Sequence, residues 1–192
     1  MFIQRRLLLP LFIFLFIVPA NAHPAKDTVT TVIINAVGGL QYDTVRFKVR
    51  PGAKVKLILT NKDDMSHNLV ITKPGARSAV VKAALDLGTE GQKMNYIPAL
   101  PEVLWSVPIL GPGETKTITF TAPQTAGIYP YVCTYPGHGA VMYGAMYVTN
   151  GAMPAIKDDP NIPPSQKKDL TRGGSAHRDH AGARKAAHPY KE

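Results

Sequence analysis

Cys133-Thr-Tyr-Pro-Gly-His138-Gly-Ala-Val-Met142 is the stretch of this 192-residue chain that says most about its fold. It carries a thiol, an imidazole and a thioether within ten residues, on what reads as one short loop between strands. A copper ion could use all three donors. The loop therefore predicts a metal site near the end of the folded part of the chain.

This loop supplies one imidazole, but a blue-copper site needs two. Blue-copper centres use two His and one Cys in a trigonal plane, with a weak and distant axial Met. His67, in Asp64-Met65-Ser66-His67-Asn68, lies upstream between two strand-like stretches. The fold would have to bring it to the loop, so the predicted ligands His67, Cys133, His138 and Met142 imply a sandwich of strands.

Each of these residues alone has an ordinary interpretation. A lone Cys cannot form an internal disulfide and often lies buried as a small hydrophobic residue. A single His is more often a loop residue, and a single Met more often belongs to the core. The metal prediction depends on the joint pattern, since only His23, His67 and His138 remain once the two ends of the chain are set aside.

The first 22 residues are typical of a secretory signal. Arg5 and Arg6 precede an apolar run from Leu7 to Val18, and Ala20-Asn21-Ala22 fits a cleavage site. The run is shorter than the ~20 residues that a membrane span needs. We expect export with cleavage after Ala22, by general secretion rather than by the twin-arginine route.

Residues 151–192 differ from the rest in being rich in Pro, Gly, Ser and Lys and in showing no apolar periodicity. Such a segment buries too little surface to offset its ordering entropy, so it predicts a disordered, basic tail. Its three histidines, His177, His180 and His188, could capture copper or touch an acidic partner or a membrane. A solvated spacer is the favoured interpretation.

Between these ends, residues 27–150 predict one domain of short strands. Alternating or β-branched segments occupy ranges 28–35, 45–49, 54–60, 68–72, 115–120, 127–133 and 144–149. The pattern breaks between Lys73 and Val107, where Val80 to Leu87 has helical spacing. Seven or eight strands with such spacing predict an all-β sandwich with a short helical flap.

Met65-Ser66-His67-Asn68 and Cys133-x4-His138-x3-Met142 resemble the azurin and auracyanin branch of the cupredoxins, over residues 27–150. The resemblance implies a Greek-key β-sandwich of eight strands with one type 1 copper ion beneath one end. His67, Cys133 and His138 would be the equatorial ligands and Met142 the axial ligand.

The same resemblance implies roles around the ligands. The Ser66 carbonyl would lie on the opposite axial side, and Asn68 and Thr134 would tie the two ligand loops together. Met65, Pro136 and Gly137 resemble the apolar rim around the exposed ligand edge, with His138 as the port for the electron. The azurin disulfide is absent, because the chain has a single Cys.

The function expected from these ligands is one-electron transfer between redox partners in the periplasm or another exported location, with copper cycling between Cu(I) and Cu(II). Copper storage or delivery is the alternative. An enzyme is not expected: there is no His-x-His pair for a second copper, and Pro24 and the lack of a fitting second His disfavour a copper brace at His23.

The charge of the chain bears on its partners. After the predicted signal, residues 23–150 carry a net charge of +4 and residues 151–192 a further +3, which favours acidic or anionic partners. Transient redox proteins are expected, such as cytochromes or a copper or haem enzyme. Nucleic acid is not expected, because no basic stripe interleaves with aromatic residues.

Overall fold

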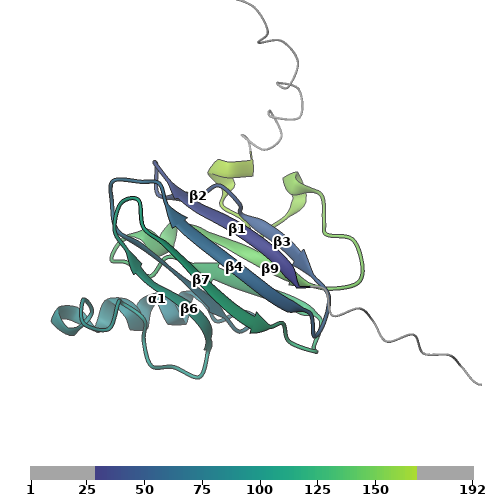
Figure 1. Ribbon diagram of the computed structural model, residues 1–192, viewed down its shortest axis with the longest axis horizontal. Coiled ribbons are helices and arrows are strands. Elements are labelled where there is room, and N and C mark those ends of the chain that lie inside the picture. The colour runs from purple at the N-terminus through teal and green to yellow at the C-terminus, as the bar shows by residue number, and fades with distance from the viewer. Residues whose placement is uncertain (1–28, 168–192) are drawn as a thin grey trace, which may run out of the picture.

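Two β-sheets face each other in the computed structural model, which describes residues 29–167 of the chain (Figure 1). One sheet has four strands in the order β2-β1-β4-β7, and the other has five in the order β3-β9-β8-β5-β6. The predicted all-β sandwich with one short helix is confirmed.

The first sheet consists of β1 (Thr30–Val37), β2 (Gln41–Tyr42), β4 (Lys54–Asn61) and β7 (Thr115–Thr121). The second consists of β3 (Arg46–Val49), β5 (His67–Thr72), β6 (Val103–Leu110), β8 (Gly127–Val132) and β9 (Tyr143–Val148). β1 pairs with β4 and β3 with β9 in parallel, while the other pairs are antiparallel. The chain therefore crosses between the sheets, which brings segments distant in sequence side by side.

The core lies between the two sheets and follows the two-residue period of the strands. In β4, Val55, Leu57 and Leu59 are buried, whereas Lys54 and Lys56, which alternate with them, are exposed. Inward-facing side chains of both sheets pack into one apolar cluster that also contains Cys133 and Met142. The predicted ligands thus lie at the boundary of a rigid core.

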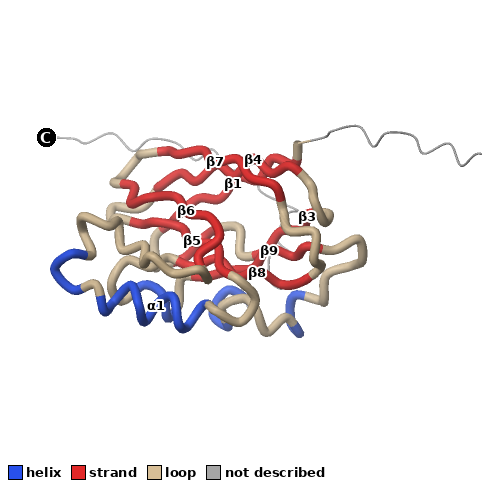
Figure 2. Tube along the Cα trace, turned by 90° about the horizontal axis from the view of Figure 1, so that it is seen from below, coloured by secondary structure: helices blue, strands red, loops and turns tan. Residues whose placement is uncertain are grey.

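The helix α1 (Arg77–Asp86) covers the outer face of the second sheet (Figure 2). Val80 packs there with Val70, Val132 and Tyr143 in a second apolar cluster. No side chain caps the start of this ten-residue helix, so its stability depends on that packing. Its cover explains why β5 is buried along its whole length instead of alternating. Among the described residues, no helix has the length and apolarity needed to cross a membrane.

The described residues contain nine strands rather than the seven or eight expected, because the sequence patterns predicted neither β2 nor β6. β2 is only two residues long. β6 begins inside the segment between Lys73 and Val107, where the strand pattern is interrupted, and it ends just beyond Pro108. Both strands lie at sheet edges, where a missing backbone donor is tolerated and the alternation of burial is weak.

The segment 151–167, which we name the C-terminal strap, packs against the sandwich, so the prediction that disorder begins at 151 was wrong for these residues. The Arg46 guanidinium donates to Asp159 Oδ2 at 3.1 Å, and the Tyr147 hydroxyl donates to Asp159 Oδ1 at 2.6 Å. Gln166 Nε2 donates to the Tyr42 carbonyl oxygen at 2.7 Å, and Ile162 is buried. A few anchoring side chains order the segment, and average composition does not reveal them. The predicted signal peptide and the remaining tail, 168–192, lie outside the described residues.

Candidate metal centre

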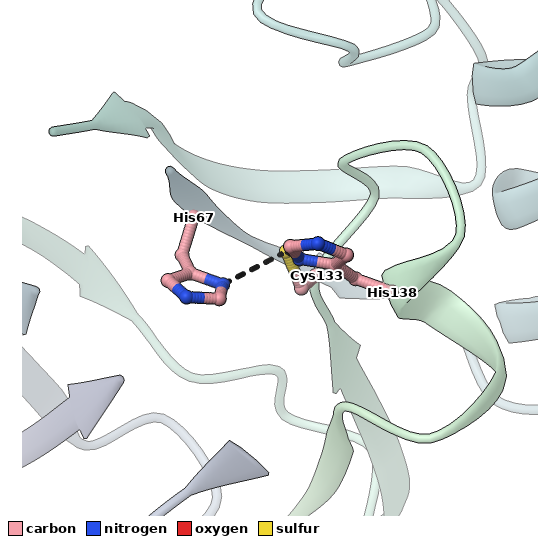
Figure 3. Close-up of side chains that lie close together, drawn as sticks. All are labelled: His67, Cys133 and His138. Carbon is pink, nitrogen blue, oxygen red and sulfur yellow. Dashed lines mark hydrogen bonds between the residues drawn. The ribbon is translucent and has the colours of Figure 1, made fainter. Parts of the chain in front are cut away.

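His67, Cys133 and His138 lie close together (Figure 3). His67 is the first residue of β5, Cys133 follows the last residue of β8, and His138 begins the short helix η2 (His138–Ala140). One donor atom from each lies within 4.8 Å of the other two, and all three side chains are buried. The structure therefore brings together the three equatorial candidates found in the sequence.

The spacing of the three donors fits a shared metal ion. Cys133 Sγ lies 3.9 Å from His67 Nδ1 and 3.6 Å from His138 Nδ1. Metal–sulfur and metal–nitrogen bonds of about 2.3 and 2.0 Å, meeting at tetrahedral to trigonal angles, separate S and N by roughly 3.5–3.7 Å. Little movement would be needed for a thiolate and two imidazoles to bind one ion.

The ligand loop is closed by its own backbone. Gly137 has a φ of +82°, which turns the chain into η2, and His138 N–H donates to the Tyr135 carbonyl at 3.0 Å. At the base of the loop Cys133 N–H donates to the Met142 carbonyl at 3.0 Å. The backbone of the fully buried Met142 therefore lies beside that of Cys133, and its role as the axial ligand stays a prediction.

Asn68 and Thr134 connect the two loops that carry the ligands. Asn68 Nδ2 donates to Thr134 Oγ1 at 2.8 Å, and the Thr134 N–H donates to Asn68 Oδ1 at 2.7 Å. Asn68 Nδ2 also donates to the Asn95 carbonyl at 2.7 Å. Asn68 directly follows His67 and Thr134 directly follows Cys133, so the pair holds these two candidate ligands in register.

Burial favours the neutral forms of the Cys133 thiol and the His138 imidazole. Burial raises the pKa of the Cys133 thiol to about 11, although hydrogen bonds from the backbone of Asn68 and Tyr135 oppose the shift. Burial, and next the proximity of His67, lower the pKa of His138. An imidazole that stays neutral is ready to bind a metal, and the ion would displace the thiol proton on binding.

One residue of the site was missed in the sequence. His67 Nε2 lies 2.9 Å from Asp63 Oδ2, and that hydrogen bond is the main cause that lowers the pKa of Asp63. The side chain of Asp63 is only 8% exposed. The available clue was the pair Asp63-Asp64 in the short loop that leads to His67, with Asp63 four residues before the imidazole.

Aromatic rings and apolar side chains surround the ligand loop. The Tyr135 ring lies 4.9 Å from that of His138 and 5.3 Å from that of Tyr96. Met65, Pro136 and Gly137 are exposed, as expected of a rim, whereas His138 retains only 3% exposure. Ser66 is half-buried in the loop before β5, and its axial role stays a prediction.

Comparison with known proteins agrees with this geometry. Residues 29–149 match the family described as "Copper binding proteins, plastocyanin/azurin family". Auracyanin-A of Chloroflexus aurantiacus is 34% identical over 111 residues, which are 57% of this chain and 67% of that protein. Azurin of Bordetella pertussis is 32% identical over 136 residues, which cover 66% of this chain and 89% of azurin.

Solved structures show the same likeness. A dithionite-reduced auracyanin from Roseiflexus castenholzii superimposes with a TM-score of 0.57 at 35% identity, covering 62% of this chain and 97% of that one. Auracyanin A from Chloroflexus aurantiacus, described as a "blue" copper protein, gives a TM-score of 0.57 at 31% identity, covering 64% of this chain and 100% of the other.

Proposed function

Because this chain belongs to the plastocyanin/azurin family of copper-binding proteins, whose type 1 copper its His-Cys-His cluster fits, we propose that it carries single electrons between redox partners. The observation that carries the proposal is the convergence of one thiol and two imidazoles, from positions 67, 133 and 138, on one buried point. A bound copper ion would supply the chemistry by cycling between Cu(I) and Cu(II).

In this proposal His67, Cys133 and His138 are the equatorial ligands and Met142 is the axial ligand, with the Ser66 carbonyl opposite. Asn68 and Thr134 hold the two loops at a fixed separation. Buried ligands on closely packed strands move little. A site that need not rearrange when its charge changes by one suits rapid electron exchange.

The proposed entry for the electron is the edge of His138. His138, which is 3% exposed, lies on the loop that also carries the exposed Pro136 and Gly137, and Met65 is exposed on the loop before His67. Transient contacts with a cytochrome, or with a copper or haem enzyme, would form on this apolar rim, and the excess of positive charge on the chain would favour acidic partners. No catalytic residue is proposed.

The proposal includes export. Residues 1–22 would be removed as a signal peptide, the cupredoxin domain would include residues 27–150, and the strap would join it to a basic tail. The described residues support the domain directly, since the family match spans 29–149. Mass spectrometry of the protein secreted from cells would test the cleavage after Ala22.

A redox titration of the copper-loaded protein tests electron transfer against copper delivery. We expect reversible cycling, followed by fast electron exchange with a cytochrome in stopped-flow mixing. A relative in this fold has been described in a dithionite-reduced form, which supports a site that accepts electrons. Loss of the ion to a copper chelator or acceptor protein at each reduction would contradict the carrier function and favour delivery.

A further inference from the structure

Asp63 contacts the imidazole of His67 on the side away from the sulfur. His67 Nε2 lies 2.9 Å from Asp63 Oδ2, while His67 Nδ1 faces Cys133 Sγ at 3.9 Å. The His67 side chain is fully buried and that of Asp63 is 8% exposed. The carboxylate is therefore a largely buried partner of a predicted ligand. It differs in this from the carboxylates of surface ion pairs such as Lys82–Asp86, whose side chains are 76% and 61% exposed.

The loop before β5 holds this carboxylate in place. The backbone N–H of Asp63 donates to Asn61 Oδ1 at 3.0 Å, and the Asp64 N–H donates to Asp63 Oδ1 at 2.8 Å. Asn61 is buried and anchors the loop through bonds from its Nδ2 to the carbonyls of Met65 and Leu110, at 2.7 and 2.9 Å. Each oxygen of Asp63 thus has its own donor, and the oxygen on the ring side is left for His67.

The contact decides which ring nitrogen carries the proton. An ionised carboxylate can only accept a hydrogen bond, so Nε2 donates this one, and in the neutral form of the ring Nδ1 is the nitrogen without a proton. Nδ1 is then left with a lone pair aimed at the sulfur and at the point where the donors converge. Hydrogen bonds from a ligand His to a carboxylate fix the ring and make it a stronger base.

We propose that Asp63 is a positioning residue that fixes the tautomer of His67 and lowers the reduction potential of the copper site. The inference rests on the proposed function. A more basic imidazole, with a negative carboxylate behind it, stabilises Cu(II) more than Cu(I). Removing the carboxylate should therefore make the site easier to reduce.

The test compares Asp63→Ala and Asp63→Asn with Asp64→Ala. For Asp63→Ala we expect the ratio of Cu(II) to Cu(I) affinity to fall about tenfold, the lower end of the effect of such outer contacts on metal affinity. A tenfold change is a rise of about 59 mV for a one-electron couple. Asp63→Asn keeps an oxygen acceptor without the charge, so its potential should rise by less.

Asp64→Ala is the matched control. Asp64 is exposed and adjacent in sequence, and the backbone N–H that it gives to Asp63 remains after the substitution. The variant loses the same charge but no contact with the ring. If its potential rises as much as that of Asp63→Ala, net charge alone explains the effect and the proposal is overturned.

A second readout needs no copper. Nitrogen-15 NMR of the metal-free protein at neutral pH should show His67 protonated at Nε2 in the natural chain and in Asp63→Asn, and a mixture of tautomers in Asp63→Ala. An unchanged tautomer together with an unchanged potential in Asp63→Ala would overturn the proposal. If the natural chain forms no type 1 centre, the proposed function fails, and the NMR result still decides whether Asp63 positions His67.

Discussion

At the scale of single residues, the chemistry of the site depends on one sulfur. Cys133 is the only Cys of the chain, and it lies in the apolar core with both imidazoles at contact distance. A thiol with a pKa raised by burial binds a proton tightly, so only a strongly bound metal ion would keep it ionised.

Cys133→Ser should therefore abolish the intense visible band that a copper thiolate produces. We expect the natural domain to turn blue when Cu(II) is added and the variant to stay nearly colourless, since an alcohol oxygen is a poor soft ligand. Absorption and paramagnetic resonance spectra provide the measurement. Met142→Leu is the matched variant, because it preserves the thiolate and should retain an intense band.

Asn68→Ala should loosen the link between the two ligand loops. It leaves the buried Thr134 N–H without its acceptor, which costs about 1–3 kcal/mol. Urea unfolding of the metal-free protein would measure the loss. Thr134→Val removes only the hydroxyl and should cost less. Equal stabilities for Asn68→Ala and the natural chain would contradict the role of this pair.

At the scale of elements, α1 supports the ligand loop from outside the sandwich. A Cβ atom at Gly139 would lie 2.7 Å from both methyl carbons of Val81 and 3.2 Å from the Cys133 carbonyl oxygen. On the same helix, Arg77 lies 3.6 Å from the centre of the Tyr143 ring, which follows the loop. The flap and the loop are thus packed as one unit.

Gly139→Ala should displace the loop or the helix. Overpacking of this kind typically costs about 1–3 kcal/mol, and a displaced loop would also alter the copper spectrum. Val81→Ala removes the two methyl groups that the new side chain meets, so the double variant should recover part of the loss. Thermal unfolding of the four proteins in a double-mutant cycle measures the coupling. An additive result would show that the helix does not restrain the loop.

At the scale of the whole molecule, the C-terminal strap closes the side of the sandwich on which β2 and β3 lie (Figure 1). It bonds to β3 and β9 through Asp159 and to the backbone of β2 through Gln166. The two sheets are thereby linked by a segment that lies beyond the family match at 149.

A chain that ends after Asn150 should have a lower free energy of unfolding than one that ends after Lys167. The shorter chain loses the buried Ile162, worth about 1.5–3 kcal/mol, and leaves Arg46 without its carboxylate. Chemical denaturation of the two truncated proteins measures the difference. Identical stabilities would show that the strap contributes nothing.

The strap should also confer acid sensitivity. Burial raises the pKa of Asp159, but hydrogen bonds from Tyr147, Asn161 and Arg46 outweigh it and hold the pKa below the ordinary value. The ionised form therefore stabilises the fold above a pH of about 4, and this contribution is lost as the pH falls through the lowered pKa. The stability advantage of the chain ending at Lys167 over the one ending at Asn150 should shrink below that pH, and Asp159→Asn should remove most of the pH dependence.

Sequence patterns alone determined the class of the fold and nominated the candidate donors, three of which the structure brings together. Alternation of apolar and polar residues, as in β4, is a local property that follows from the two-residue period of a strand. The sequence alone therefore predicts such strands. The ligand loop is also local, because Cys133, His138 and Met142 lie within ten residues. His67 could be nominated by its neighbours Met65, Ser66 and Asn68.

Only the tertiary structure decided which distant groups meet. Asp63 turns toward His67 because the buried Asn61 holds the loop, and Asp159 becomes buried because Arg46 and Tyr147 of two neighbouring strands face it. The weak alternation of β6 likewise reflects its place at the edge of a sheet. Contacts of this kind depend on how the strands cross between the sheets. Composition and periodicity describe each segment by itself and carry no information on its partners in space.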